Sequence, residues 1–553
     1  ALGEKITEAL GEKFTEALEE KIKEALEGKI KEVLEKITPL AAVIIIDADI
    51  LRMNGANISR HLSWAKTAED LVRYATSDTI FTEISGLDPS PDVIVRFDCD
   101  GVIHIKTTKV DSRSTPSTTF QLYCSNPELA EGDHVGHNSG SMPGATAAFT
   151  AGLAAQLIKG SDLNPAIKNG LKRACHLVSE GFSREPTDRE PTDDQNMSFT
   201  YPDISKDDPK CAQEAQLNPI GPLRIPSNLP TDWNFLNQKN KEELNKIAED
   251  IVNIGIDAGL KEFPVAKYGP LCTADRQEME SFRAISNLLE EYMHGAPKKP
   301  LSIGAFGKPG SGKSFGLKAV INEVARRQGK EVQELEFNLS QLLQYNDLLT
   351  AFHTIRDQSF SGKVPVVLFD EFDSAFQGKP LGWLQYFLAP MQDGTFFENG
   401  CHRPLGSAIF VFIGGTSPTF EKFRESLHTP EAVAAKKPDF VSRLRGFVNI
   451  WGPEKINRSD KTYSIRRAII LRYQLNLRML PKHSGAGVER VHQNVLRALL
   501  RVPSFRHGNR SLESILHMSR IAGREYFGPA ALPIDHQLDL HVDATKFVKL
   551  LKN

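Results

Sequence analysis

Several features that would place a protein in a specialised class are scarce in this chain of 553 residues. Its six cysteines form no Cys-x-x-Cys pair, and no histidine cluster with metal-ligand spacing accompanies them. We therefore expect reduced intracellular thiols rather than a disulfide framework. The formal net charge is only −3 and no long basic block is present, so the composition indicates neither nucleic acid nor an anionic membrane as a partner.

Long apolar runs are missing as well. The longest, such as Val43–Ile46 and Ala408–Ile413, have the length of a strand and are far shorter than a membrane span. The chain also begins with no secretory signal, so we expect a cytoplasmic protein without a membrane segment. Its 40% hydrophobic and 25% charged residues are typical of a globular chain with about three or four domains.

One eight-residue motif carries the strongest functional signal. It follows the apolar run Leu301–Phe306 and opens a stretch with a helical pattern, and it consists of Gly307, Lys308, Pro309, Gly310, Ser311, Gly312, Lys313 and Ser314. In such a loop the glycines let backbone N–H groups converge on phosphates, Lys313 reaches the terminal phosphates and the Ser314 hydroxyl ligates Mg²⁺. The sequence thus predicts a site for a nucleoside triphosphate, with ATP and Mg²⁺ as its ligands.

A second motif strengthens the first. The run Val366–Phe369 predicts a buried strand, and it ends in the carboxylates Asp370 and Glu371. Asp370 would hold Mg²⁺, partly through water, and Glu371 would polarise the attacking water, because phosphoryl transfer requires mainly positioning and charge neutralisation. Thr416, beyond the strand expected over 408–413, would orient that water from the other side.

The region around these motifs predicts an α/β fold with a parallel sheet and a helical lid. Strands are expected over 301–305, 332–337, 364–369 and 408–413, a helix over 313–327, and the lid helices over 464–521. The segment Phe263–Pro270 and a helix over 275–294 precede the phosphate loop, and an adenine pocket is expected there from position alone.

Two further motifs make this region resemble the AAA+ ATPase family, in particular its Clp-type unfoldases. Asp439-Phe-Val-Ser-Arg443-Leu-Arg445 is similar to the family's arginine-finger box, and Gly508-Asn-Arg510 is similar to its sensor-2 motif. The resemblance covers about residues 261–525. It implies that Arg443, or alternatively Arg445, reaches the site of a neighbouring subunit and that Arg510 contacts the γ-phosphate from the lid. Both roles imply a homo-oligomer, usually a hexameric ring.

Residues 39–183 predict a separate α/β domain, with strands over 43–47 and 93–97 and helices over 63–76 and 144–159. Over about residues 41–182 the stretches 47–52, 93–102 and 144–153 resemble, in order and spacing, the C-terminal half of a ribokinase-like (PfkB-family) kinase. That family has a catalytic Asp where this chain has Ala147, which cannot accept a proton. The resemblance implies a catalytically dead domain, which either binds a small nucleoside-like or sugar-like ligand or serves assembly.

The remaining segments flank or connect these domains. Residues 1–38 carry an eight-residue repeat that predicts an amphipathic helix, either a solvated extension or a docking or oligomer-forming helix. Residues 184–260 predict a Pro-rich linker followed by a docking helix. We expect the ATPase core over 261–453, the helical lid over 454–528 and a C-terminal tail over 529–553.

The target of the predicted ATPase is not evident, because no aromatic pore loop is found before the Asp-Glu strand. The aromatic stretch 383–397 predicts either a helix packed on the sheet and then a hairpin, or a substrate-contacting loop. Two functions stay open. The chain is either an ATP-hydrolysing ring motor or remodeller of an unknown protein target, or an ATP-dependent oligomeric switch or scaffold with slow hydrolysis, as in bacterial defence or stress signalling.

Overall fold

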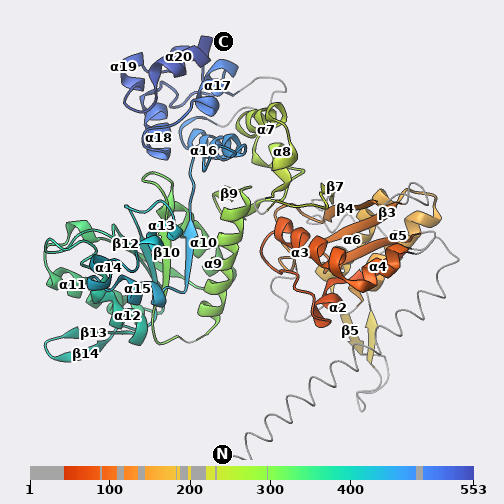
Figure 1. Cartoon of the computed structure of the whole chain (residues 1–553), viewed down its shortest axis with the longest axis horizontal. Helices are drawn as coiled ribbons and strands as arrows, with labels where there is room; N and C mark the ends of the chain where they lie inside the picture. The colour runs from red at the N-terminus through yellow and green to blue at the C-terminus, as the bar shows by residue number, and fades with distance from the viewer. Residues whose placement is uncertain are drawn as a thin grey trace, which may run out of the picture. The chain divides into compact units, whose positions relative to one another are not determined.

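The computed structural model describes residues 43–86, 90–108, 117–134, 144–181, 183–186, 197–200, 219–230, 233–295, 297–480 and 490–552. The chain divides into two compact units, residues 1–235 and 236–553, and each is described by itself (Figure 1). The amphipathic helix predicted over 1–38 lies outside the described residues. Within the described ranges, no helix combines the length and the apolar character that crossing a membrane requires.

The first unit is built on a five-stranded sheet in the order β1-β2-β3-β4-β7. Only β1 and β2 run parallel among these described strands, and the other pairs are antiparallel. The strands are β1 (Val43–Asp47), β2 (Asp92–Phe97), β3 (Gly101–Thr108), β4 (Ser117–Cys124) and β7 (Ile220–Ile225). The structure thus confirms the two strands predicted for this unit and adds three that the sequence analysis did not assign.

Helices pack on both faces of this sheet. The helices are α2 (Ala48–Met53), α3 (Trp64–Ser77), α4 (Thr79–Gly86), α5 (Ala145–Ile158) and α6 (Leu163–Glu180), and they confirm the two predicted helices. Ile94 belongs to the core that α5 and α6 form with the sheet. Phe97 points to the opposite face by strand alternation and contacts the ring of Trp64 at the start of α3, at 5.9 Å between centroids.

The linker predicted over 184–260 is wrong in part. The segment β7 (Ile220–Ile225) pairs with β4 at the end of the sheet order, and β5 (Ser183–Pro186) pairs with β6 (Met197–Thr200). Pro222 is compatible with this position because a terminal strand can lack one N–H without losing a ladder bond. The expected helix is observed as α7 (Lys241–Asn253) and α8 (Ile256–Gly259), within the second unit.

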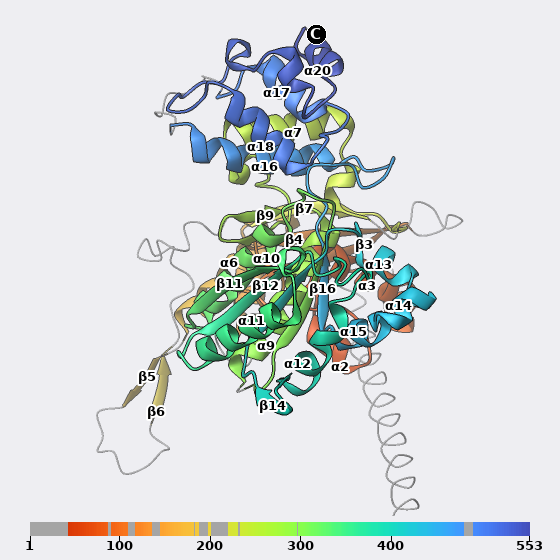
Figure 2. The ribbon, with the colours of Figure 1, turned by 90° about the vertical axis from the view of Figure 1, so that its left-hand side faces the viewer.

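The second unit contains a fully parallel sheet in the order β11-β12-β15-β10-β16 (Figure 2). Four strands confirm the prediction: β10 (Leu301–Phe306), β11 (Val332–Asn338), β12 (Val364–Asp370) and β15 (Ile409–Ile413). The fifth, β16 (Gly446–Asn449), was not predicted, because four residues are too short for a periodic pattern.

The two faces of this sheet differ in the shape of their side chains. Aliphatic residues such as Ile303 and Leu368 face α9 (Arg276–His294) and α10 (Lys313–Arg327). Phenylalanines such as Phe369 and Phe412 face α11 (Tyr345–Ser359) in an aromatic core. Helices therefore cover both faces, as a parallel sheet requires.

The aromatic stretch 383–397 follows the first of its two predicted interpretations. It forms η5 (Leu384–Phe387), α12 (Leu388–Asp393) and a hairpin of β13 (Thr395–Glu398) and β14 (Cys401–Pro404). Trp383, Phe387 and Phe396 are buried in the aromatic core, whereas Phe397 is 51% exposed. Most of these aromatic side chains therefore stabilise the fold and are not available to a substrate.

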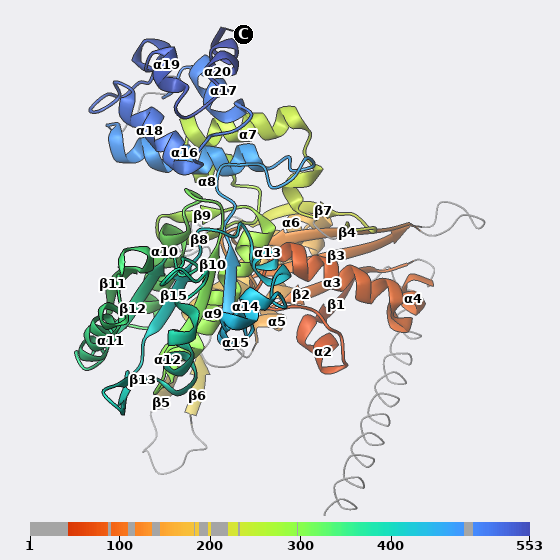
Figure 3. The same cartoon turned by 60° about the vertical axis from the view of Figure 1, so that its left-hand side comes forward.

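The lid helices lie together with α7 (Figure 3). They comprise α16 (Tyr463–Arg478), α17 (Gln493–Arg501), α18 (Asn509–Met518), α19 (Asp535–Leu538) and α20 (Ala544–Lys552). Arg472 of α16 donates to the Val252 carbonyl at the end of α7 at 2.6 Å, so α7 docks on the lid. The predicted tail is also folded here, because Phe547 of α20 is buried.

Candidate active site

The loop of residues 307–314 joins the end of β10 to the start of α10. Gly310 and Gly312 have φ values of +75° and +95°, which side chains with a Cβ rarely adopt. A Cβ on Gly310 would also lie 2.3 Å from the carbonyl oxygen of His507 in the lid. Because α10 starts at Lys313, its first backbone N–H groups are directed at the loop, where an anion is favoured.

Lys313 carries a buried ammonium group into this loop. Its Nζ donates to the carbonyl oxygens of Gly307 at 3.0 Å and Lys308 at 3.3 Å. Burial lowers the pKa of Lys313, and the nearby carboxylates of Asp370, Glu371 and Asp373 act in the opposite direction. A cation in this position is partly dehydrated and therefore interacts strongly with an incoming phosphate.

Asp370 and Glu371 follow β12 at the same edge of the sheet. The Glu371 N–H donates to Asp370 Oδ1 at 3.1 Å, and Glu371 has a φ of +52°. A Cβ on Gly415 would lie 2.2 Å from Glu371 Oε2, so this glycine makes room for the carboxylate. Burial and the neighbouring Asp370 raise the pKa of Glu371, which makes it a better proton acceptor than an exposed carboxylate.

Asp373 is a site residue that the sequence analysis missed. Its carboxylate accepts the N–H groups of Gly415 at 3.0 Å and Thr416 at 2.8 Å, and it also accepts the Thr416 hydroxyl. The loop after β15 is thereby attached to the loop after β12. The only sequence signal was a third carboxylate two residues after Glu371. That Thr416 orients a water stays a prediction.

The lid contacts the phosphate loop directly through the start of α18. The Asn509 N–H donates to the Gly310 carbonyl at 2.8 Å, and its side-chain amide donates to the Ser311 carbonyl at 3.2 Å. These bonds place Arg510 beside the loop, where it lines the same cavity as Lys313. Asn509 was not predicted, although it lies inside the Gly508-Asn-Arg510 motif.

The loop, the carboxylates and the lid enclose a cavity of about 360 Å³. Its charged lining residues include Lys313, Asp370, Glu371 and Arg510. Its apolar wall comprises Leu271, Phe282, Ile450, Ile469 and Tyr473. Pro270 and Phe282, from the two segments expected to form an adenine pocket, line the cavity, and α16 of the lid adds Ile469 and Tyr473, which were not predicted. That adenine binds here stays a prediction. Such a cavity suits a ligand with a charged end and a flat apolar end.

The donors for a divalent cation are in place. Ser314 and Asp370 both line this cavity and offer a hydroxyl and a carboxylate oxygen. Oxygen donors of this kind, supplemented by phosphate oxygens and water, are those that Mg²⁺ prefers. The residues present therefore fit the predicted Mg²⁺.

A buried ionic network lies beside the apolar wall. Arg466 of α16 donates to Asp275 at 3.2 Å and to Asp460 at 2.6 Å. Glu278 accepts the Thr273 hydroxyl and the Trp451 N–H, both at 2.9 Å. Burial, and then the charge of Asp275, raise the pKa of Glu278 to about 7. The network ties the lid to the first turn of α9 and was not predicted.

The predicted finger residues are not part of this cavity. Arg443 ends α15 (Lys437–Arg443), and Arg445 immediately precedes β16. Because β16 is parallel to β10, both arginines lie at the sheet edge opposite to the phosphate loop. The Arg443 guanidinium donates to the Asp439 carbonyl at 2.6 Å, and Arg445 is exposed. Neither arginine therefore lines the cavity of this chain.

Comparison with protein families identifies the central part of this site. Residues 303–396 match the model of the family described as "ATPase family associated with various cellular activities (AAA)". The match includes the phosphate loop, Asp370 and Glu371. It ends before Thr416, Arg443 and Arg510, and it lies outside residues 41–182, whose ribokinase-like resemblance stays a prediction. The chain therefore carries an AAA ATPase domain.

Comparison with curated proteins and solved structures adds only distant likenesses. No curated protein sequence matches the chain. The ORC2 protein of Aeropyrum pernix is 11% identical with a TM-score of 0.31, over 50% of this chain and 68% of that one. NtrX from Brucella abortus is 11% identical with a TM-score of 0.29, over 49% of this chain and 59% of that one. Hsp104 of S. cerevisiae is 20% identical with a TM-score of 0.23, over 34% of this chain and 36% of that one. The chain spans less than two thirds of the last two structures.

Proposed function

We propose that this chain is an ATP-hydrolysing AAA+ protein whose second unit binds and cleaves ATP in the cavity between the phosphate loop and the lid. One observation carries the proposal. A buried lysine, a carboxylate pair and a lid arginine from separate segments meet around one cavity that also has an apolar wall. Lys313 and Arg510 would hold the phosphates, and Tyr473 and Leu271 would hold the base.

The proposed reaction uses the chain's own groups for positioning and charge. Glu371 accepts a proton from the attacking water, whose oxygen forms a bond to the γ-phosphorus while the bond to the β–γ bridging oxygen breaks. Lys313 and Arg510 neutralise the charge that develops on the phosphate oxygens. Thr416, held by Asp373, would orient the water. Mg²⁺, held by Ser314 and by Asp370 partly through water, would supply further charge neutralisation.

A complete site would need a second copy of the chain. Arg443 and Arg445 lie at the sheet edge opposite to the phosphate loop, so neither arginine contributes its charge to the site of the same chain. In a homo-oligomeric ring, which we propose to be hexameric, one of these arginines would reach the γ-phosphate of the neighbouring subunit. We propose Arg443, because it ends a helix packed on the core through the buried Phe440.

Phosphate release measured against protein concentration tests the proposal. Turnover per chain should rise with concentration and fall more than about 100-fold in Glu371→Gln, while ATP binding is kept. Glu331→Gln, an exposed glutamate outside the site, is the matched control. Unchanged turnover in Glu371→Gln would refute the assigned role. Mixing the wild type with Arg443→Ala or Arg445→Ala then identifies the arginine finger. If the residue acts on the neighbouring subunit, the variant should lower the ATP turnover of wild-type subunits in the same ring.

A second candidate function is an ATP-dependent oligomeric switch or scaffold with slow hydrolysis. The observation that favours it is the direct bonding of Asn509 in the lid to the carbonyls of Gly310 and Ser311. These bonds join the lid to the loop that would bind phosphate, so a nucleotide that shifts the loop would also shift the lid. ATP-driven assembly with negligible turnover would select the switch, and concentration-dependent turnover would select the motor or remodeller of a protein target.

A further inference from the structure

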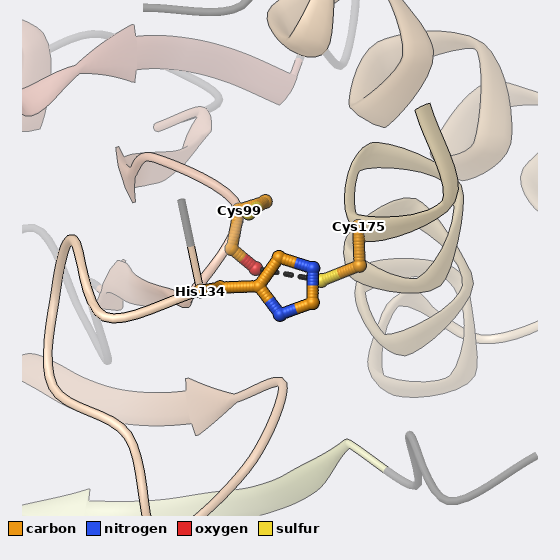
Figure 4. Close-up of side chains that lie close together, drawn as sticks. All are labelled: Cys99, His134 and Cys175. Atoms are coloured by element: carbon orange, nitrogen blue, oxygen red, sulfur yellow. Dashed lines mark hydrogen bonds between the residues drawn. The ribbon is translucent and has the colours of Figure 1, made fainter. Parts of the chain in front are cut away.

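Three side chains that are far apart in the sequence meet in the first unit, whereas the proposed nucleotide site belongs to the second unit. Cys99 lies in the turn between β2 and β3, His134 in the loop after β4, and Cys175 in the middle of α6. The two sulfurs and one imidazole nitrogen all lie within 4.8 Å of one another (Figure 4). From the sequence we expected only reduced thiols, because the cysteines form no Cys-x-x-Cys pair and no histidine cluster accompanies them with metal-ligand spacing.

The two thiols are withdrawn from solvent. Cys99 and Cys175 are 1% and 0% exposed, and the Cys175 thiol donates to the Cys99 carbonyl oxygen at 3.1 Å. The imidazole of His134 is half-buried, and its Nε2 lies 3.0 Å from the hydroxyl of Ser179, one turn after Cys175 on α6. The helix thus supplies one sulfur and also fixes the ring.

The backbone around the cluster is fixed independently of these three side chains. The buried carboxylate of Asp100 accepts the N–H groups of Gly132 at 2.7 Å and His134 at 3.2 Å. The Ser125 N–H and hydroxyl both donate to the Asp100 carbonyl, at 2.8 and 3.0 Å. The turn that carries Cys99 is therefore bonded to the loop that carries His134, and the cluster does not depend on side-chain contacts alone.

We propose that Cys99, His134 and Cys175 form a binding site for a divalent ion of the zinc class. Two thiolates and an imidazole are the ligands that Zn²⁺ prefers, at about 2.3 Å from sulfur and about 2.0 Å from nitrogen. Tetrahedral geometry with these bonds places two sulfurs about 3.8 Å apart. Groups that already lie within 4.8 Å reach this spacing through small side-chain movements.

The charge balance of the loaded site suits a buried position. Each thiol loses its proton to solvent as its sulfur bonds to the metal, so two thiolates balance one divalent cation and no net charge is buried. Three protein ligands leave one position of a tetrahedral ion for water or another donor. The bound ion would join α6 to the β2–β3 turn and to the loop after β4, three segments of the first unit that are distant in sequence.

Metal binding by the full chain, purified under reducing conditions, tests this site. With zinc added and excess removed, elemental analysis should find one tightly bound zinc per chain. Cobalt(II) added to the metal-free protein should give the sulfur-to-cobalt charge-transfer absorption of thiolate ligands, together with the visible bands of a tetrahedral ion. Cys99→Ser, Cys175→Ser and His134→Ala should each weaken zinc more than about 100-fold, because even an outer partner of a ligand is worth about 10–100-fold.

The controls distinguish a lost ligand from a damaged fold. Cys124→Ser removes an equally buried thiol of the same unit that lies outside the cluster, and it should keep the zinc. His134→Ala changes a half-buried loop residue, so loss of zinc with an unchanged circular dichroism spectrum supports coordination. Three results would overturn the proposal: no charge-transfer band, zinc retained by Cys175→Ser, or a non-reduced mass two hydrogens lower that shows a Cys99–Cys175 disulfide instead.

Discussion

Both units carry charged residues at the carboxyl ends of parallel strands, but the interactions of these residues differ between the units. In each, carboxylates and basic residues gather where parallel strands end. In the second unit, Lys313 and Arg510 face Asp370 and Glu371 across a cavity. In the first unit, the ends of β1 and β2 carry Asp47 and Asp98, with Arg52, Arg60, Arg96 and Glu131 around them.

The charged side chains at this place in the first unit form ion pairs with one another. Arg52 forms two hydrogen bonds with the buried Glu131, at 2.5 and 2.6 Å. Arg60 pairs with Asp49, and Arg96 pairs with Asp47 and with the hydroxyl of Thr146. Thr146 lies beside Ala147, where the ribokinase-like resemblance would place an Asp that acts as a base. The choice between the assembly role and the ligand-binding role of this unit stays a prediction.

The difference teaches that position in a fold does not by itself make a ligand site. Parallel strand ends concentrate backbone dipoles and polar residues in both units. In the second unit the Lys313 ammonium donates to the Gly307 carbonyl, and it lines the cavity together with the carboxylates of Asp370 and Glu371. Where the side chains reach each other, they form a stabilising cluster instead.

The largest effect should come from removing the lysine of the cavity. We expect Lys313→Ala to lower kcat/KM for ATP at least about 1,000-fold, because one neutral donor to a transition state is already worth about 100–1,000-fold. Lys330→Ala, an exposed lysine just after α10, should be silent. Phosphate release and nucleotide binding measure both variants. Retained turnover in Lys313→Ala would show that the cavity is not the hydrolytic site.

Breaking the ion-pair cluster of the first unit should destabilise that unit alone. We expect Glu131→Gln to cost about 3 kcal/mol, because it leaves the Arg52 guanidinium without its buried charged partner. Hydrogen exchange of the full chain should quicken in β1 to β4 and stay unchanged in β10 to β15. The exposed Glu83→Gln is the control. A loss of ATP turnover with unchanged exchange would mean that the cluster serves catalysis.

A smaller effect is expected where a carboxylate positions other groups. In the wild type the N–H groups of Gly415 and Thr416 donate to the two carboxylate oxygens of Asp373. Asp373→Asn replaces one of these oxygens with an NH₂ group, which cannot accept a hydrogen bond, so the loop of Gly415 and Thr416 should shift. We expect kcat to fall about 10–100-fold, equivalent to about 1.4–2.7 kcal/mol, with ATP affinity nearly unchanged. Asp393→Asn, an exposed aspartate, is the control. An equal loss of affinity would assign Asp373 to binding instead.

The last prediction concerns the pH dependence of stability. The pKa of Glu278 is about 7 in the folded chain and 4.5 ordinarily, so between these values the folded state binds more protons than the unfolded state. The contribution of Glu278 is therefore complete below about pH 4.5 and is lost as the pH rises to about 7, by at most about 1.4 kcal/mol per pH unit.

Calorimetry between pH 5 and 7 tests this sign. The unfolding transition of the second unit should weaken with rising pH in the wild type and less steeply in Glu278→Gln. Glu291→Gln changes an exposed glutamate of the same helix and should keep the wild-type slope. A transition that strengthens as the pH rises, to the same degree in both proteins, would show that Glu278 does not control it.

Local patterns predicted the parts of the fold and site that are contiguous in sequence. The phosphate loop and Asp370-Glu371 each occupy one short segment next to a buried strand, so both were found with the correct strands. The strand β16 escaped because four residues show no periodicity. The β7 strand was missed because it contains Pro222, which a strand at the end of a sheet tolerates.

Residues whose role depends on a distant partner could not be predicted in this way. Asp373 acts on the loop after β15, and Asn509 acts on the phosphate loop. Tyr473 completes the apolar wall from the lid. Each is an ordinary polar or aromatic residue in its own segment, and only a long-range contact distinguishes it.

The phosphate loop, the carboxylate pair and the parallel α/β domain could be predicted from the residues alone, because backbone freedom, strand burial and helix periodicity are local properties. Which charges face a cavity and which pair with each other became evident only from the folded chain. So did the proximity of Cys99, His134 and Cys175. The physical reason is that electrostatic and coordination interactions act over a few ångströms in space, whatever the separation of the residues along the chain.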